Sequence, residues 1–168
     1  MALDLAMVTV VPGTIQAANS PLMPTFFARS DYPMPFDSEP LVVGDTNGDG
    51  IPDLINLQYG NGIVMVQLGN GDGTFRPGPI TNTVAGSSLT FIGADLNGDR
   101  IIDLVLNNAT GVVICIGNGD GTFQPGAIYE IPGMNDTDLG YSVIADFNGD
   151  GIPDIATTSS SSGVWLLT

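Results

Sequence analysis

Three near-copies of one nine-residue segment constrain this chain more than any other feature of its sequence. They read DTNGDGIPD at 45–53, DLNGDRIID at 95–103 and DFNGDGIPD at 146–154. Consecutive copies begin about fifty residues apart, because their first residues are Asp45, Asp95 and Asp146. A repeat of that length indicates stacked units of one supersecondary type and not a single catalytic site.

Each copy has the residue pattern of a calcium-binding loop, with oxygen-bearing side chains at positions 1, 3, 5 and 9 and a glycine at position 4. Calcium takes about six to eight oxygen ligands, and a short loop that encloses it needs the tight backbone that glycine permits. The backbone carbonyl of the Ile at position 7 is a further ligand. Carboxylates this close repel one another without a cation, so we expect about three calcium ions. The predicted ligands are Asp45, Asn47, Asp49, Ile51 and Asp53 in the first loop, Asp95, Asn97, Asp99, Ile101 and Asp103 in the second, and Asp146, Asn148, Asp150, Ile152 and Asp154 in the third.

Two other structures use similar residues. The first alternative is an Asx-rich turn without metal, since Asn, Asp and Gly are ordinary turn residues. Three copies with the same ligand positions favour a bound ion over this alternative. An EF-hand is the other, and it needs a bidentate Glu at position 12 between two helices. Position 12 here is Asn56, Leu106 or Thr157, and the short runs after each loop read as strands, so the EF-hand is excluded.

The second loop departs from the other two at its sixth position. Arg100 stands there, whereas the first and third loops have Gly50 and Gly151. If this position needs a left-handed backbone, a residue with a side chain costs about 1 kcal/mol. We therefore predict that the second calcium site is the weakest.

Charge and composition exclude several functions. The net charge is −15, from 18 acidic and 3 basic residues, which makes nucleic acid or an anionic membrane a poor partner. The chain has no histidine and no lysine, so it cannot hold a Ser-His-Asp triad, a Schiff base, a P-loop or zinc-imidazole ligands. The single cysteine, Cys115, lies in an apolar run and is expected to be a buried strand thiol. No apolar run approaches about 18 residues, so we expect no membrane insertion.

A second repeated motif completes the unit. GNGDGTF occurs at 69–75 and again at 117–123, and Asn-Gly-Asp-Gly between apolar runs predicts a hairpin. One unit then contains four strands, with the calcium loop joining the first two and the hairpin the last two. The predicted strands lie near 41–44, 54–59, 63–68 and 79–84 in one unit and near 89–94, 104–107, 112–116 and 127–131 in the next.

The frame extends to both ends of the chain. Leu3-Asp4-Leu5-Ala6 resembles the stretch from Pro52 to Ile55, and 163–167 resembles 62–66. The sequence thus predicts one all-β repeat region over 1–168, in units of about 1–40, 41–88, 89–138 and 139–168, the terminal ones incomplete. Open units expose strand edges, which propellers avoid by closing a ring. The fold class is therefore a β-propeller of about four four-stranded blades, as part of a longer propeller, as a chain that closes by assembly, or as a ring closed within one chain.

These paired motifs resemble FG-GAP-like (VCBS-type) repeats. Such repeats are similar to the calcium-bearing blades of the integrin α-subunit, to propeller lectins and to large bacterial surface proteins. The resemblance implies calcium in the loop between the first two strands of each blade. It also implies an extracellular, cell-surface or periplasmic location and a role in adhesion or ligand binding. The family's Phe-Gly…Gly-Ala-Pro string is absent, and only FIGAD at 91–95 lies near it.

The leading hypothesis for function is a calcium-stabilised propeller module, not an enzyme, that binds a carbohydrate or protein ligand on a secreted or surface protein. A lectin with pockets between blades is a second hypothesis, and a purely structural blade array is another. A hydrolase that uses paired carboxylates is disfavoured, because the acids cluster in the loops and no isolated acid pair stands out.

Overall fold

A computed structural model of the chain describes residues 10–11, 14–15, 31–32, 38–58, 60–86, 90–132, 140–159 and 163–168. The chain divides into two compact units, Met1–Pro33 and Met34–Thr168. In the first unit, β1 (Val10–Val11) pairs antiparallel with β2 (Thr14–Ile15). The predicted repeat unit at 1–40 lies largely outside the described residues. The described part of the chain contains no helix long and apolar enough to cross a membrane.

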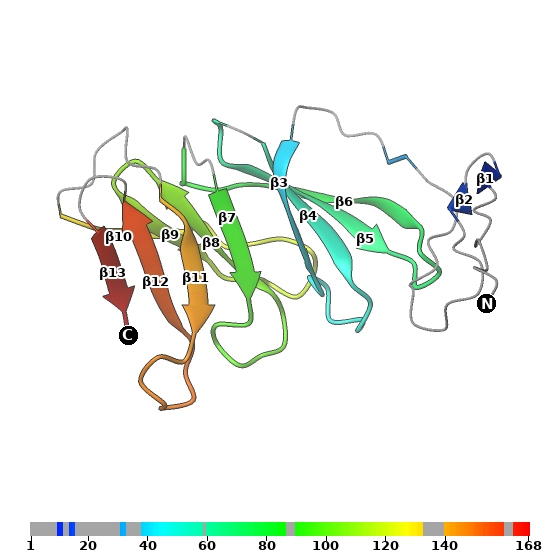
Figure 1. The fold of residues 1–168 in the computed structure, drawn as a ribbon. Helices are drawn as coiled ribbons and strands as arrows, with labels where there is room; N and C mark the ends of the chain where they lie inside the picture. The colour runs from blue at the N-terminus through cyan, green and yellow to red at the C-terminus, as the bar shows by residue number, and fades with distance from the viewer. Residues whose placement is uncertain are drawn as a thin grey trace, which may run out of the picture. The chain divides into compact units, whose positions relative to one another are not determined.

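The described residues of the second unit form three antiparallel sheets, each built from consecutive strands (Figure 1). Blade 1 contains β3 (Ser38–Gly44), β4 (Asp53–Gln58), β5 (Ile63–Gly69) and β6 (Phe75–Asn82). Blade 2 contains β7 (Thr90–Ala94), β8 (Asp103–Asn108), β9 (Gly111–Cys115) and β10 (Ala127–Glu130). Blade 3 has three strands, β11 (Ser142–Ala145), β12 (Asp154–Ser159) and β13 (Gly163–Leu167). These strands confirm the predicted all-β, propeller-type fold, and their order does not close a ring among the described residues.

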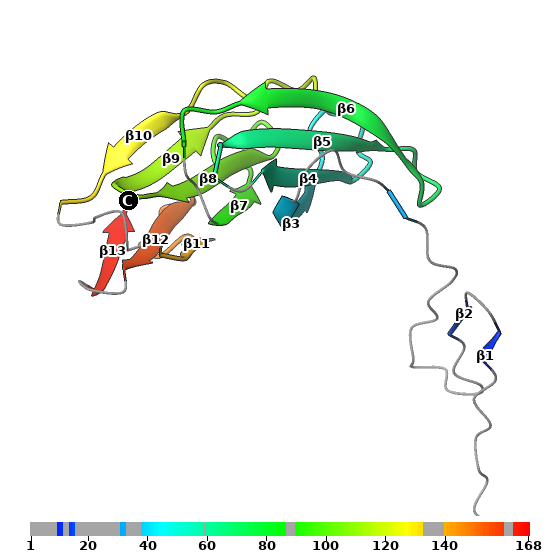
Figure 2. The same cartoon turned by 90° about the horizontal axis from the view of Figure 1, so that it is seen from above.

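Adjacent blades meet through their first strands and their faces. β7 of blade 2 packs beside both β3 and β11, and Figure 2 shows blades 1 and 2 side by side from above. The predicted strand positions are confirmed to within a few residues, with the largest difference at β6. This strand begins at Phe75 and not near Pro79, because pairing continues from the hairpin through Gly69 and Phe75.

The two faces of each blade differ, and we name them by the residues that follow the ninth loop position. The head face carries Leu54, Leu104 or Ile155, and the tail face carries the next residue, Ile55, Val105 or Ala156, because side chains alternate along a strand. The tail face of blade 1 packs on the head face of blade 2 in one buried apolar cluster. This cluster includes Ile55, Leu57, Val64, Val66, Phe91, Leu104, Leu106, Val113 and Cys115.

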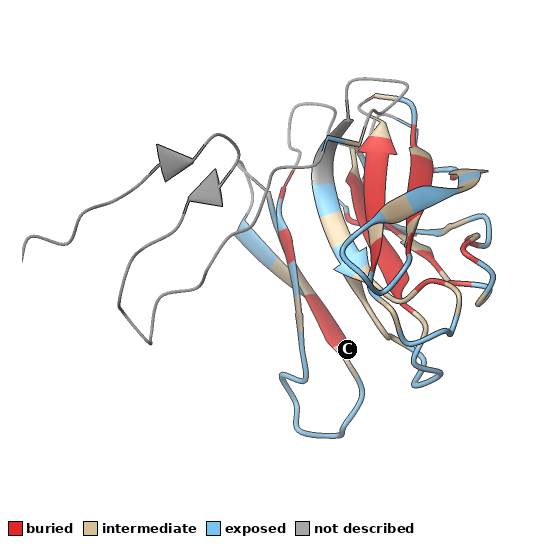
Figure 3. Ribbon diagram, turned by 90° about the vertical axis from the view of Figure 1, so that its right-hand side faces the viewer, coloured by how far each residue is buried: buried red, intermediate tan, exposed pale blue. Residues whose placement is uncertain are grey.

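The tail face of blade 2 packs on the head face of blade 3 in a second cluster. Val105 and Val112 contribute from blade 2, and Ile155 with the half-buried Trp165 from blade 3. The central strands are accordingly the most buried elements of the unit (Figure 3). Cys115 is buried in the first cluster, as predicted, and burial raises the pKa of its thiol to about 11. The stacking of tail on head thus supplies the core.

Candidate metal loops

Each loop is organised by the carboxylate at its first position. In the first loop, one oxygen of Asp45 accepts hydrogen bonds from the backbone N–H of Asn47 (3.1 Å) and Gly48 (2.8 Å), and the other from Gly50 (2.8 Å). The same pattern recurs in the third loop, where Asp146 accepts from the N–H groups of Gly149 and Gly151. These backbone hydrogen bonds lower the pKa of Asp146, with that from Gly151 the largest cause. The Asp146 carboxylate is therefore held in its charged form at the centre of the third loop.

Positions 3 and 5 continue this network with oxygen atoms. Asn47 Oδ1 accepts from the N–H of Asp49 at 3.0 Å, and Asp49 Oδ1 accepts from the N–H of Ile51 at 2.8 Å. The second loop repeats both bonds through Asn97 and Asp99. The third loop also repeats both, through the equivalent residues Asn148 and Asp150. All three loops thus repeat the same set of oxygen atoms at positions 3 and 5, and oxygen is the ligand atom that calcium prefers.

The carboxylate at the ninth position has a different environment. Asp53 is fully buried, and its Oδ2 accepts hydrogen bonds from both the backbone N–H and the hydroxyl of Thr46. Its Oδ1 accepts from the N–H of Gly69, at the start of the Gly-rich hairpin. Asp103 likewise joins Leu96 N–H to Gly117 N–H, at 2.9 and 2.8 Å. These two carboxylates fasten the first and second loops to the hairpin of the same blade.

Burial affects the ninth-position carboxylate of the second loop. Desolvation raises the pKa of Asp103, and the nearby carboxylates of Asp99 and Asp95 raise it further, against the lowering effect of its two N–H donors. In the described part of the chain, no group of three or more acidic, histidine or cysteine side chains already has an arrangement that holds a metal ion. The predicted ligands of each site lie in one loop and offer only oxygen atoms, and their metal binding stays a prediction.

Sequence reasoning missed the fastening role of the ninth-position Asp and a polar network between blades 2 and 3. Asn107 donates hydrogen bonds to Gly140 O (2.8 Å) and Thr157 Oγ1 (3.1 Å), and it accepts one from Ser142 Oγ (2.7 Å). The side chains of Asn107, Ser142 and Thr157 are polar and buried, and they lie where blades 2 and 3 meet. A buried polar group needs such partners, and an Asn at the end of an apolar strand was the available signal.

The hairpins also depend on a short local network. Asp72 and Asp120 each accept a hydrogen bond from the backbone N–H and from the hydroxyl of the Thr two residues later. The hydroxyl is the larger cause of the lowered pKa of each carboxyl. This geometry accords with a turn role for both residues.

Arg100 has the left-handed backbone that its position demands, with φ of 70°, beside 77° for Gly50 and 86° for Gly151. Because a side chain is disfavoured there, we expect Arg100→Gly to raise the free energy of unfolding by about 1 kcal/mol. Urea denaturation measures this change. Gly50→Arg is the matched control in the first loop and is expected to lower the free energy by a similar amount. If Arg100→Gly and the wild type have equal free energies of unfolding, the backbone at Arg100 is not strained.

These observations define a class of protein: a propeller-type repeat protein whose blades each carry an Asp/Asn-rich loop between the first two strands. The FG-GAP-like repeat family matches residues 45–106 and 95–157. The chain therefore belongs to the FG-GAP-like repeat family, as its motifs predict. No curated protein matches it.

Solved structures support the same fold. The chain is similar to an Agrocybe aegerita lectin that recognises non-reducing terminal N-acetylglucosamine, with 26% identity and a TM-score of 0.53 over 77% of this chain. It is also similar to the Photorhabdus luminescens Tc holotoxin pore (17% identity, TM-score 0.55, 75% of this chain) and to a TcdB2–TccC3–Cdc42 structure (19%, 0.53, 74%). The chain spans 38% of the lectin chain and 6% of each of the other two chains. The latter two likenesses concern the fold alone.

Proposed function

We propose that this chain is a non-enzymatic, calcium-binding propeller module of a secreted or surface protein, in which calcium stabilises the loops and other faces bind a ligand. The observation that supports it most is the loop chemistry. Three loops repeat one set of oxygen atoms around a first-position carboxylate that accepts backbone N–H hydrogen bonds, and nine of the 18 acidic residues lie in them. Divalent ions in all three loops add six positive charges and reduce the net charge from −15 to −9.

Calcium titration by isothermal calorimetry tests this proposal. We expect about three sites with dissociation constants of about 10⁻⁴ to 10⁻³ M, the range of extracellular modules. Asp150→Asn is expected to remove one site, because it deletes a ligand charge yet keeps the oxygen that accepts from the N–H of Ile152. Asp72→Asn makes the same charge change in a hairpin outside the loops and is expected to keep all three sites. The proposal is contradicted if calcium binding produces no heat change, or if both variants lose the same number of calcium sites.

A carbohydrate ligand is the second candidate, and one observation favours it over a protein ligand. The solved structure with 26% identity is a lectin whose sugar is a terminal N-acetylglucosamine. A glycan array that includes this sugar, run in calcium, separates a lectin from a protein adhesin or a structural array. Silence across the array counts against the lectin.

A further inference from the structure

The chain uses one interface twice. In both contacts the tail face of one blade packs on the head face of the next, so the two surfaces of the contact differ from each other. Backbone hydrogen bonds accompany the first contact: Ile102 N–H donates to Asp45 O at 3.0 Å, and Gly121 N–H donates to Thr46 O at 2.9 Å. An interface of this head-to-tail kind has no built-in limit and continues wherever a free head and a free tail meet.

Blade 1 has an exposed head face. Leu41 and Val43 on β3 are 55% and 56% exposed, and Ile80 on β6 is 58% exposed. Phe91, which occupies in blade 2 the place of Leu41, is only 4% exposed, because blade 1 covers it. The apolar head face of blade 1 thus matches a surface that this chain elsewhere covers with a tail face.

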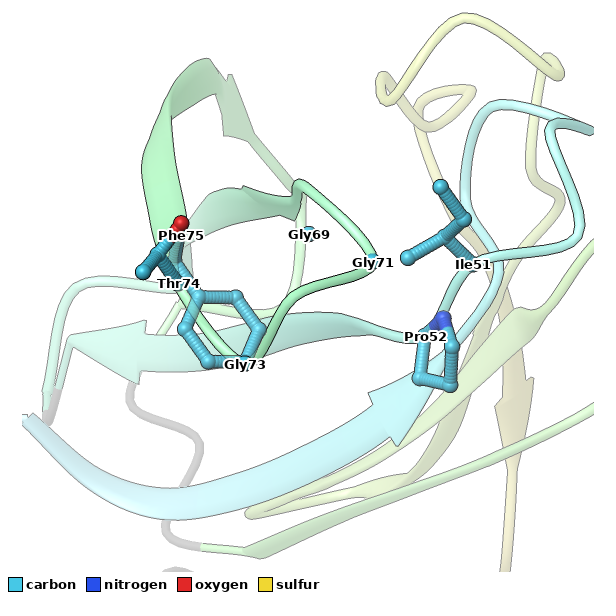
Figure 4. A pocket seen from close by; sticks show the side chains of 7 residues that line it. All are labelled: Ile51, Pro52, Gly69, Gly71, Gly73, Thr74 and Phe75. Carbon is cyan, nitrogen blue, oxygen red and sulfur yellow. The ribbon is translucent and has the colours of Figure 1, made fainter.

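A cleft of about 220 Å³ lies at the outer end of this face, between the first loop and the hairpin of blade 1. Figure 4 shows the side chains of Ile51, Pro52 and Phe75 around it. In blade 2 the equivalent place is filled. Gly121 lies against Pro79 of blade 1, and Phe123, the equivalent of Phe75, is 4% exposed. The cleft is therefore open in blade 1 at the place where, in blade 2, a neighbouring blade packs.

A polar atom on the same face lacks a partner. Oδ1 of Asn56 is buried, and no hydrogen bond reaches it from the described residues. Its equivalent in blade 3 is Thr157, whose hydroxyl accepts a hydrogen bond from Asn107 on the tail face of blade 2. A covering tail face is therefore expected to present a donor at this point, since a buried acceptor without one is costly.

Blade 3 has an exposed tail face that provides these complements. Val143, Val164 and Leu166 are 58%, 71% and 52% exposed on it. Thr158 occupies there the place that Asn107 has in blade 2. Its exposed hydroxyl donates a long 3.3 Å hydrogen bond to Tyr141 O and accepts one from the N–H of Tyr141 at 3.1 Å. The face thus offers apolar side chains and a hydroxyl donor at the positions that the head face of blade 1 requires.

We propose that copies of this chain associate head to tail, with the tail face of blade 3 in one copy seated on the head face of blade 1 in the next. The contact repeats the geometry of the two contacts within the chain. It covers Leu41, Val43 and Ile80 with Val143, Val164 and Leu166, and it brings the Thr158 hydroxyl to Asn56 Oδ1. Because head and tail differ, the assembly closes into a ring if the rotation per copy allows it and otherwise continues as a filament.

Sedimentation velocity with light scattering tests the assembly, in calcium and in about 0.15 M salt to screen repulsion between acidic copies. The wild type is expected to rise with concentration to at least two-fold its 17.3 kDa mass. Val43→Lys blocks the head, Leu166→Lys blocks the tail, and each alone is expected to stay monomeric. Mixing the two is expected to restore a 1:1 complex of two-fold mass, because each variant keeps one intact face. If the interface instead joins two identical faces, mixing the two variants does not restore a complex.

The control is Val84→Lys, which places the same charge on an exposed apolar residue in the turn after β6, outside the strands that form the two faces. It is expected to associate like the wild type. Circular dichroism checks that every variant is folded, which the exposure of these side chains favours. A wild type that stays monomeric to near-millimolar concentration overturns the proposal, as does association that neither face variant weakens. If the wild type is a monomer and Val43→Lys lowers its free energy of unfolding, residues of the same chain cover the head face.

Discussion

Removal of calcium with excess EDTA is expected to lower the free energy of unfolding by about 7 kcal/mol relative to about 5 mM calcium. With a dissociation constant of about 10⁻⁴ M, each site stabilises the folded state by about 2 kcal/mol, and three independent sites add. For a chain of this size the melting temperature should fall by roughly 15 to 25 °C. Thermal denaturation followed by circular dichroism measures the shift.

The physical reason is the crowding of charge in each loop. Three carboxylates lie within nine residues in every loop, the one at position 5 is always exposed, and the chain has only three arginines to offset them. Magnesium is the control, because it requires a smaller octahedral shell and gives up its water reluctantly, so it is expected to stabilise far less than calcium. A melting temperature that does not depend on calcium means that the loops are Asx turns whose N–H groups are satisfied by side chains alone.

Leu104→Ala is expected to destabilise the protein by about 3 to 5 kcal/mol, the second largest effect. Leu104 is fully buried on the head face of blade 2, within the cluster that joins this blade to blade 1. Its truncation removes apolar contacts and leaves a cavity between two sheets that cannot close without moving both. Urea denaturation in saturating calcium measures the loss.

Leu104→Met is the matched variant at the same position. It keeps nearly the same volume and is expected to cost less than about 1.5 kcal/mol. If the two variants are equally stable, the contact between blades 1 and 2 does not form a packed core in solution. The comparison therefore tests the stacking of the blades separately from the chemistry of the loops.

The fold was predictable because most of its information is local. Asn-Gly-Asp-Gly turns, β-branched runs and the fifty-residue repeat fix where strands start and stop, and Ile63–Gly69 and Thr90–Ala94 lie where the pattern places them. The left-handed backbone at Arg100 was likewise implied by the glycines at the equivalent positions of the other loops. The all-β propeller class and the FG-GAP-like family follow from these signals.

The roles of individual loop residues were less predictable. Position in the motif alone makes Asp53 equivalent to Asp45, yet Asp45 organises its own exposed loop, and Asp53 is buried and bonded to Gly69, 16 residues away. The distinction depends on how the loop packs against a hairpin, which a nine-residue pattern does not contain. The same holds for Asn107, whose partners Gly140, Ser142 and Thr157 come from the following blade.

The sequence by itself determined the repeat, the loop chemistry, the strand positions and the fold class, because turn preferences and side-chain alternation act over a few residues. Only the tertiary structure decided which face of each strand is covered, and by which blade. Strand alternation gives every blade two apolar faces, and burial of either requires a neighbour that is distant in the chain. For this reason the head face of blade 1 and the tail face of blade 3, with Leu41 and Leu166 exposed, became visible only in the folded chain.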